Sequence, residues 1–325
     1  WIGKYYQYEV TVFCPWTNQI ETSIATDPYS RSLSANGLRS HICDINAQDL
    51  KPSGWDDLSH SPLESKCDIS IYELHVRDFS ASDLSVPPDL RGTFSAFDLD
   101  SSTGVAHLTA LAAAGLTHVH LLPVYDFGSV NELKSEWRFP EDTLDVPMES
   151  LGAACTRQQA AVKAVCHEDA YNWGYDPVHY GVPDGSYCID PDGSGRILEF
   201  RSMVRGLHRM GLRVVMDVVY NHTFGSGPHG NVSVLDKLVP GYYHRRNATG
   251  DIEASTCMNN TASEHFMFNR LIIDDLTHWA TNMKINAFRF DLMGHLMLST
   301  VRSAFAKLSN LTVEEHGVDG SQIYF

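Results

Sequence analysis

The interpretation of this chain depends on the run Phe288-Arg289-Phe290-Asp291-Leu292-Met293-Gly294-His295. Its two phenylalanines alternate with Arg289 and Asp291, and successive residues of a strand point to opposite faces. We therefore predict a strand with one apolar and one charged face, followed by a helix over residues 296–308. A charged pair at the carboxyl end of such a strand is where α/β barrels hold catalytic groups. A structural ion pair at a strand end is the alternative interpretation.

Strands and helices alternate from residue 69 onward. We predict strands at 69–76, 117–124 and 212–219, and helices at 104–114, 196–210 and 262–283. The dense apolar run 212–219 is typical of a strand buried on both faces of a parallel sheet. This alternation predicts a parallel α/β architecture. Glu73 and His75 fall on the inward face of the first strand, where we expect them to pack or to support a site.

The chain divides into three parts. Residues 1–50 contain short predicted strands and turns, which indicate a piece of a small β domain. Residues 51–68 are predicted to be a linker, and residues 69–325 hold the strand–helix units. Two connections within that part are long, at 125–194 and 220–261. Both leave the carboxyl ends of strands, and loops of this length in a compact domain are usually functional.

Composition narrows the classes of ligand. The formal net charge of −16, from 40 acidic and 24 basic residues, argues against nucleic acid and anionic membrane surfaces. It favours a neutral or cationic ligand, and no apolar run is long enough to span a membrane. The seven cysteines are scattered without a CxxC pair, which favours reduced thiols in an intracellular compartment. We interpret the four Asn-x-Ser/Thr sequons as chance occurrences, and the motifs of nucleotide, P-loop and zinc-protease sites are absent.

Two further segments carry candidate site residues. Asp217 lies near the end of the predicted strand 212–219, and Asn221 and His222 follow it; a cap-and-turn sequence is the alternative. The heptapeptide Tyr171-Asn172-Trp173-Gly174-Tyr175-Asp176-Pro177 holds three aromatic residues in the first long connection. Such a platform suits the apolar face of a pyranose ring. A loop anchored by its own aromatic side chains explains it equally well.

Together these motifs resemble the α-amylase superfamily of glycoside hydrolases. Residues 217–223 and 288–295 match two of its signature regions, and 171–177 and 71–78 are typical of its pullulanase-type debranching branch. The segments 181–183, 233–237, 239–243 and 259–265 are similar to plant and algal limit dextrinases. The resemblance implies the first half of a (β/α)8 TIM barrel, preceded by the end of a β-sandwich carbohydrate-binding module at residues 1–50.

The resemblance also implies a reaction and a set of roles. The reaction is retaining hydrolysis of α-1,6 branch linkages in pullulan, limit dextrins and starch-derived glucans. Asp291 is then the nucleophile, and Arg289 keeps its carboxylate ionised and oriented. The substrate-binding residues are implied to be Arg289, His222, Asp217, Tyr175, Trp173 and His295. The chemistry requires no cofactor, and a structural calcium ion is possible. The implied location is the plastid, and the oligomeric state stays open.

In the superfamily the general acid is a Glu just after the start of the fifth barrel strand, and the chain ends there, at Phe325. Glu314 and Glu315 precede that strand and do not match the acid's position. We therefore expect a truncated chain that is inactive alone, and Trp1 indicates that the native start lies elsewhere. Two alternatives are a non-catalytic glucan-binding protein, which intact site residues disfavour, and another debranching or branching enzyme.

Overall fold

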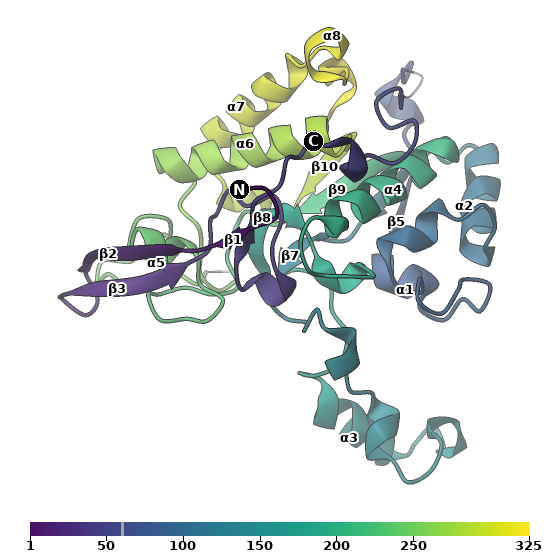
Figure 1. Ribbon diagram of the computed structural model, residues 1–325, viewed down its shortest axis with the longest axis horizontal. Coiled ribbons are helices and arrows are strands. Elements are labelled where there is room, and N and C mark those ends of the chain that lie inside the picture. Colours follow the sequence, from purple (N-terminus) through teal and green to yellow (C-terminus); the bar gives the residue numbers. More distant parts are fainter. Residues whose placement is uncertain (60–61, 256) are drawn as a thin grey trace.

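The computed structural model describes residues 1–59, 62–255 and 257–325 (Figure 1). Its strands are β1 (Tyr5–Tyr6), β2 (Tyr8–Cys14), β3 (Gln19–Ala25), β4 (Ser40–His41), β5 (Ile71–Leu74), β6 (His118–Leu121), β7 (Tyr125–Phe127), β8 (Pro177–Pro183), β9 (Arg213–Val218) and β10 (Ala287–Phe290). Its helices are α1 (Val76–Ser80), α2 (Thr103–Ala113), α3 (Thr156–Val165), α4 (Gly195–Arg209), α5 (Leu235–Leu238), α6 (Phe266–Asn282), α7 (Leu298–Ser309) and α8 (Val313–His316). Within these ranges no helix has the length and apolar character needed to cross a bilayer.

A parallel sheet forms the centre of the molecule, with strand order β10-β9-β6-β5. Helices occur between successive strands, as the predicted alternation requires. Beyond β10, Tyr324 forms a parallel bridge with Ala287, and the Phe288 N–H donates to the Tyr324 carbonyl at 3.0 Å. The part of the chain that the structure describes therefore contains four strands and the beginning of a fifth, consistent with part of a TIM barrel.

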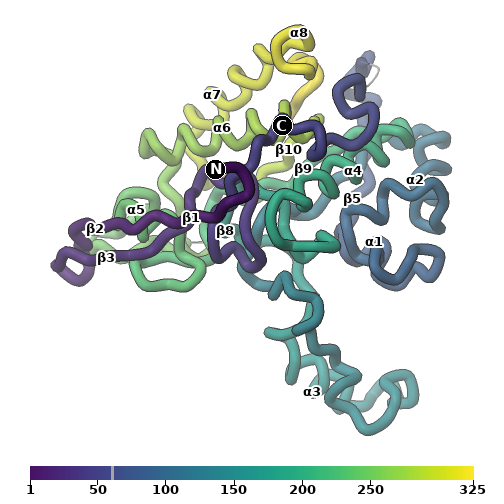
Figure 2. Tube along the Cα trace, viewed as in Figure 1, coloured from purple at the N-terminus to yellow at the C-terminus, as the bar shows by residue number. Residues whose placement is uncertain are grey.

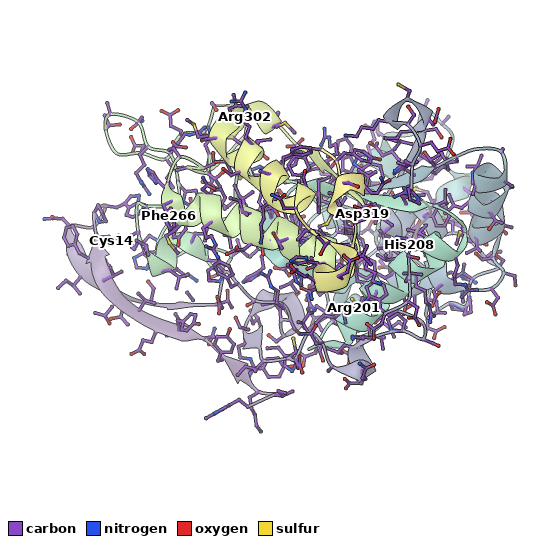
Figure 3. All side chains as sticks on the ribbon, turned by 90° about the horizontal axis from the view of Figure 1, so that it is seen from above. Cys14, Arg201, His208, Phe266, Arg302 and Asp319 are labelled. Atoms are coloured by element: carbon purple, nitrogen blue, oxygen red, sulfur yellow. The ribbon has the colours of Figure 1, made fainter. Side chains whose placement is uncertain are left out.

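Apolar side chains fix the helices onto this sheet. All six residues of β9 are buried, which confirms the predicted two-sided burial of that strand. Trp279 of α6 is also fully buried, and its indole N–H donates to the Tyr180 carbonyl at 2.8 Å. Helices α6 and α7 run side by side in Figure 1. Figure 3 shows Phe266 at one end of α6, while Arg201 of α4 reaches its other end, where it donates to the Asn282 carbonyl at 3.0 Å.

The N-terminal segment is a small antiparallel structure beside the sheet. Strands β2 and β3 form a hairpin, and β1 pairs with β4. Arg31 forms an ion pair with Asp275 of α6, and Tyr29 donates to Asp274 at 3.2 Å. These contacts attach the hairpin segment to the barrel portion. That it is the end of a β-sandwich carbohydrate-binding module stays a prediction.

The predicted linker 51–68 includes residues 60–61, which lie outside the described residues. Within its first part Trp55 is buried between two cations, Arg201 at 5.4 Å and Lys284 at 5.5 Å from the ring centroid. The Lys284 ammonium group also donates to the Leu58 carbonyl at 2.8 Å. This part of the segment therefore packs against α4 and the connection between α6 and β10.

The two long connections contain structure of their own. In 125–194, β7 and β8 pair antiparallel, and α3 lies well away from the rest of the chain (Figure 2). The connection 220–261 includes α5, and its residue 256 lies outside the described residues. Several predicted boundaries are wrong, among them the end of the strand predicted over 117–124, which stops at Leu121. The strand predicted to reach residue 76 ends at Leu74, because the side chain of His75 accepts from the Asp78 N–H and begins α1. The helix predicted from residue 262 begins at Phe266.

Candidate active site

The carboxyl ends of β9 and β10 bring Asp217, Arg289 and Asp291 together. Arg289 pairs with Asp217 in the register of the two strands. Its Nη1 donates to both carboxylate oxygens of Asp217 at 3.0 Å and to Asp291 Oδ1 at 3.1 Å. Burial opposes ionisation of Arg289, but the hydrogen bond and charge of Asp217 outweigh it and raise the pKa of the guanidinium. One guanidinium thus holds two carboxylates.

The exposures of these side chains differ. Asp217 is completely buried, whereas the side chains of Asp291 and Arg289 are 19% and 46% exposed. The backbone fixes Asp291 at the rim, since its N–H donates to the Val218 carbonyl at 2.9 Å. Leu292 then adopts φ +45°, a left-handed conformation that costs about 1–3 kcal/mol for a residue with a side chain. The chain turns away immediately after Asp291, which leaves that carboxylate accessible at the strand end.

Tyr175 and His222 complete the network. The Tyr175 hydroxyl donates to Asp217 Oδ2 at 2.8 Å, and burial together with the charge of Asp217 raises the pKa of Tyr175. His222 Nε2 lies 2.8 Å from the Tyr175 carbonyl, so Nε2 is the donor, and Nδ1 accepts from the Asn221 amide at 3.1 Å. Burial lowers the pKa of His222, which favours this neutral form. We call Asp217, Arg289, Asp291, Tyr175 and His222 the strand-end network.

The aromatic heptapeptide is held in place by its small and polar residues. Gly174 has φ +79°, and a Cβ there would lie 2.6 Å from the Pro123 carbonyl oxygen, just past β6. Buried Asn172 accepts from the Tyr187 hydroxyl at 2.9 Å, and its Oδ1 lies 3.2 Å from His75 Nε2. Both of these contacts favour the interpretation of an anchored loop. The packing of Gly174 and the contacts of Asn172 also hold Tyr175 beside Asp217.

Trp173 and His295 belong to segments that flank the strand-end network in sequence. Trp173 is 63% exposed, and its indole N–H donates to the Tyr171 hydroxyl at 2.7 Å. His295 ends the short turn Met293–His295 that follows Asp291. The structure therefore brings five of the seven predicted site residues into one network. The other two lie on segments that adjoin it in sequence.

Several known proteins similar to this chain are named pullulanases. Pullulanase 1, chloroplastic, from Arabidopsis thaliana is 53% identical over the whole chain, and a pullulanase from Klebsiella pneumoniae is 41% identical over 95% of it. A solved Klebsiella pneumoniae structure, described as a maltotriose complex of PulA, superposes over the whole chain with a TM-score of 0.93 at 39% identity, covering 38% of that chain. No family model matches the chain.

The chain is similar to pullulanases along its whole length. It spans about a third of the length of the curated relatives it matches, 34% of the Arabidopsis protein and 32% of the Klebsiella protein. The likeness to solved pullulanases extends over the N-terminal hairpin and the partial barrel alike, since the superposition covers the whole chain. The strand-end network therefore lies in a fold that the chain shares with solved pullulanases.

One residue of the candidate site was missed by the sequence interpretation. His120 of β6 lies between Glu73 and Asp217, with Nδ1 3.1 Å from Glu73 Oε2 and Nε2 3.4 Å from Asp217 Oδ2. The alternation of His120 with buried Val119 and Leu121 was the available signal. Its partners could not be predicted without the register of β5, β6 and β9.

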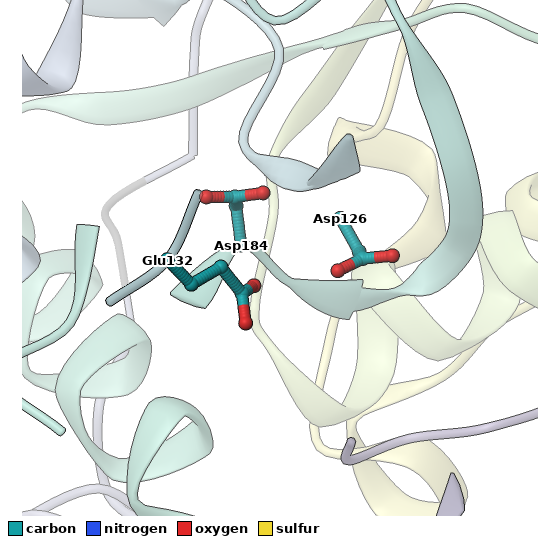
Figure 4. A group of neighbouring side chains, drawn as sticks. All are labelled: Asp126, Glu132 and Asp184. Atoms are coloured by element: carbon teal, nitrogen blue, oxygen red, sulfur yellow. The ribbon is translucent and has the colours of Figure 1, made fainter. Parts of the chain in front are cut away.

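A second cluster of carboxylates has the composition of a metal site. Asp126, Glu132 and Asp184 are buried with their oxygens within 4.8 Å of one another (Figure 4), the one such grouping found among the described residues. Arg196, also buried, lies 3.2 Å from Glu132 Oε2 and 3.9 Å from Asp126 Oδ1.

The oxygens of this group already have protein donors. His179 Nδ1 contacts Asp126 at 2.6 Å, Glu132 accepts from the Gly185 N–H at 2.7 Å, and Asp184 accepts from the Phe127 N–H at 3.1 Å. We call Asp126, Glu132, Asp184, His179 and Arg196 the sealed network. Because Arg196 supplies the positive charge, these residues do not fit a calcium ion.

Proposed function

We propose that the full-length protein containing this chain hydrolyses α-1,6 branch linkages of α-glucans such as pullulan, limit dextrins and starch-derived dextrins. The observation that carries the proposal is the bridge of Arg289 between buried Asp217 and partly exposed Asp291 at the strand ends. The names of the relatives and the maltotriose bound in a solved relative support an α-glucan as substrate.

In this proposal Asp291 is the nucleophile. Arg289 holds Oδ1, so Oδ2 attacks the anomeric carbon of the sugar. The bond from that carbon to the O6 oxygen of the leaving chain breaks, and a general acid gives this oxygen a proton. A glycosyl ester on Asp291 results, with inverted configuration. A water molecule then loses a proton to the same acid–base group and displaces Asp291, which restores the original configuration.

The other predicted site residues either orient the nucleophile or contact the sugar. Arg289 and Asp217 fix the nucleophile in one orientation, which lowers the entropic part of the barrier. Tyr175 and Trp173 offer aromatic surface to the sugar, and His222 and His295 offer polar contacts beside it. The general acid is assigned by resemblance to a Glu that follows the start of the fifth strand. That residues 1–325 are inactive by themselves stays a prediction.

Location and metal content belong to the same proposal. The chloroplastic relative supports residence in the plastid, which a fluorescent fusion of the full-length protein would test. The carboxylate chemistry proposed here needs no cofactor. Structural calcium stays a prediction, for which pullulan hydrolysis and the thermal midpoint would be compared before and after treatment with a chelator.

The test is the product of the full-length protein on pullulan, with linear amylose as the control substrate. We expect maltotriose, released first as the α-anomer and detected by proton NMR before mutarotation, and little change in amylose. Release of the β-anomer would contradict the double displacement. Hydrolysis of amylose at the same rate as pullulan would contradict the assignment to α-1,6 linkages.

A further inference from the structure

Side chains of four neighbouring strands form one row across the inner face of the sheet. Glu73 of β5 and His120 of β6 are directly paired in register. His120 pairs in turn with Val215, and Asp217 lies two residues further along β9 on the same face. Arg289 of β10 pairs with Asp217. The row therefore runs from the exposed edge of β5 to the proposed nucleophile.

Acidic and basic side chains alternate along this row. Glu73 Oε2 lies 3.1 Å from His120 Nδ1, and His120 Nε2 lies 3.4 Å from Asp217 Oδ2. The second distance is within ion-pair range, although the geometry is not that of a hydrogen bond. Each nitrogen of the His120 ring therefore faces a carboxylate oxygen, on one side from Glu73 and on the other from Asp217. His120 is buried, so its Nε2 has Asp217 rather than bulk water as its neighbour.

The contacts of Asp217 explain how this row can affect the nucleophile. Three groups share its Oδ2: the Tyr175 hydroxyl at 2.8 Å, Arg289 Nη1 at 3.0 Å and His120 Nε2 at 3.4 Å. The same Nη1 also holds Asp291 Oδ1 at 3.1 Å. If the His120 ring is removed, Asp217 Oδ2 loses one of its three neighbours, so Arg289 moves closer to Asp217 and away from Asp291.

We propose that Glu73 and His120 are positioning residues of the active site, which act through Asp217 and Arg289 to fix the orientation of Asp291. This inference rests on the proposed function for its consequences in turnover. Packing of a barrel layer is the competing explanation for His120. The two differ because packing predicts a loss of stability alone, whereas positioning predicts a loss of kcat at nearly constant KM.

The experiment measures pullulan hydrolysis by the full-length protein carrying His120→Leu, Glu73→Gln or both. We expect His120→Leu to lower kcat about 10-fold to 100-fold, as a misplaced catalytic group does. Glu73→Gln, which is isosteric and partly exposed, lowers kcat about 3-fold to 10-fold, within the range of coupled neighbours. Because both act through one contact, Glu73→Gln adds no further loss in the His120→Leu background.

His118→Leu is the matched control. His118 lies on the same strand and face one layer away, with Nδ1 2.7 Å from Thr117 Oγ1 and its ring against Tyr324. Burial and the charge of Arg213 lower the pKa of His118 to about 4, so it carries no charge in the working range. We expect this variant to lose thermal stability but to keep the parent's kcat.

Two outcomes would overturn the inference in a wild-type protein that is active on pullulan. One is a kcat within about twofold of wild type in both single variants; the other is losses that multiply in the double variant. If the wild-type protein does not hydrolyse pullulan, the proposed function fails, and a crystal structure of the full-length His120→Leu variant then decides the positioning role. Separation of Arg289 from Asp291 supports it, and an unchanged Arg289–Asp291 contact refutes it.

Discussion

The strand-end network and the sealed network are both built from acidic residues around one arginine, yet their environments differ. Arg196 is completely buried, and the side chains of Glu132 and Asp126 are at most 5% exposed. In the strand-end network Asp217 is completely buried, while the side chains of Arg289 and Asp291 are partly exposed. A buried set of charges with every partner inside the protein holds segments together. A set with one accessible carboxylate can act on a ligand, and this difference separates a structural role from a catalytic one.

The largest expected effect follows from replacing the accessible carboxylate. In the full-length protein, Asp291→Asn should lower kcat on pullulan on the order of 10⁴-fold or more, because the amide cannot form the glycosyl ester. The thermal midpoint should stay close to that of wild type. Asp100→Asn, at an exposed ion pair with Arg209, serves as the control with the same chemical change. Near-normal turnover of Asp291→Asn would place the nucleophile elsewhere.

Replacing the arginine of the sealed network should give the opposite pattern. Arg196→Met leaves buried carboxylates without their cation and should lower the free energy of unfolding by about 3–5 kcal/mol. The folded fraction should keep its kcat when assayed well below the midpoint. Arg209→Met, at a surface ion pair, should change stability by less than about 1 kcal/mol. Equal effects of the two substitutions in thermal unfolding would remove the distinction between the networks.

A smaller effect is expected where the aromatic heptapeptide crosses the strand ends. Gly174→Ala adds a Cβ against the Pro123 carbonyl at a left-handed φ and should destabilise the protein by about 1–3 kcal/mol. Displacement of Tyr175 should also weaken binding of maltotriose, which calorimetry measures. Gly152→Ala, where a Cβ meets nothing within 4 Å, should leave both quantities unchanged. Tighter binding or unchanged stability in Gly174→Ala would contradict the anchoring role.

The smallest expected effect is a pH dependence of the stability that Asp184 of the sealed network contributes. Burial, reinforced by the charges of Glu132 and Asp126, raises the pKa of Asp184. The folded state therefore binds more protons than the unfolded state above the unfolded pKa of about 3.9, and this contribution to stability falls as pH rises. Asp184→Asn has no such proton to lose. Its stability deficit relative to wild type should therefore narrow between mildly acidic and mildly alkaline pH.

Thermal unfolding of the full-length protein at these two pH values measures that difference, with Asp100→Asn as the control. A deficit that widens with pH would show that Asp184 is ionised in the folded state. That result would change the account of the sealed network without touching the strand-end network.

Local sequence patterns were sufficient to predict much of the candidate site. The alternation of Phe288 and Phe290 with Arg289 and Asp291 predicted the strand and its charged face, and the apolar run 212–219 predicted β9 with Asp217 near its end. These signals are short-range, since they depend on side-chain period and on burial of a strand. Parallel pairing of β9 with β10 then places Asp217 beside Arg289.

The parts that could not be predicted depend on contacts between distant residues. His120 joins the site only through the register of β5, β6 and β9, and Arg196 meets Glu132 across 64 positions of the sequence. The pairing of β7 with β8 inside the first long connection has the same origin. The early end of β5 is different, because the capping side chain of His75 competes with strand extension.

The most direct test of the central claim is to locate the covalent intermediate. The full-length protein would be incubated with a fluorinated glycosyl fluoride, whose slow turnover lets a glycosyl-enzyme accumulate, and its peptides examined by mass spectrometry. We predict that the sugar is attached to Asp291. Attachment to another residue would contradict the account.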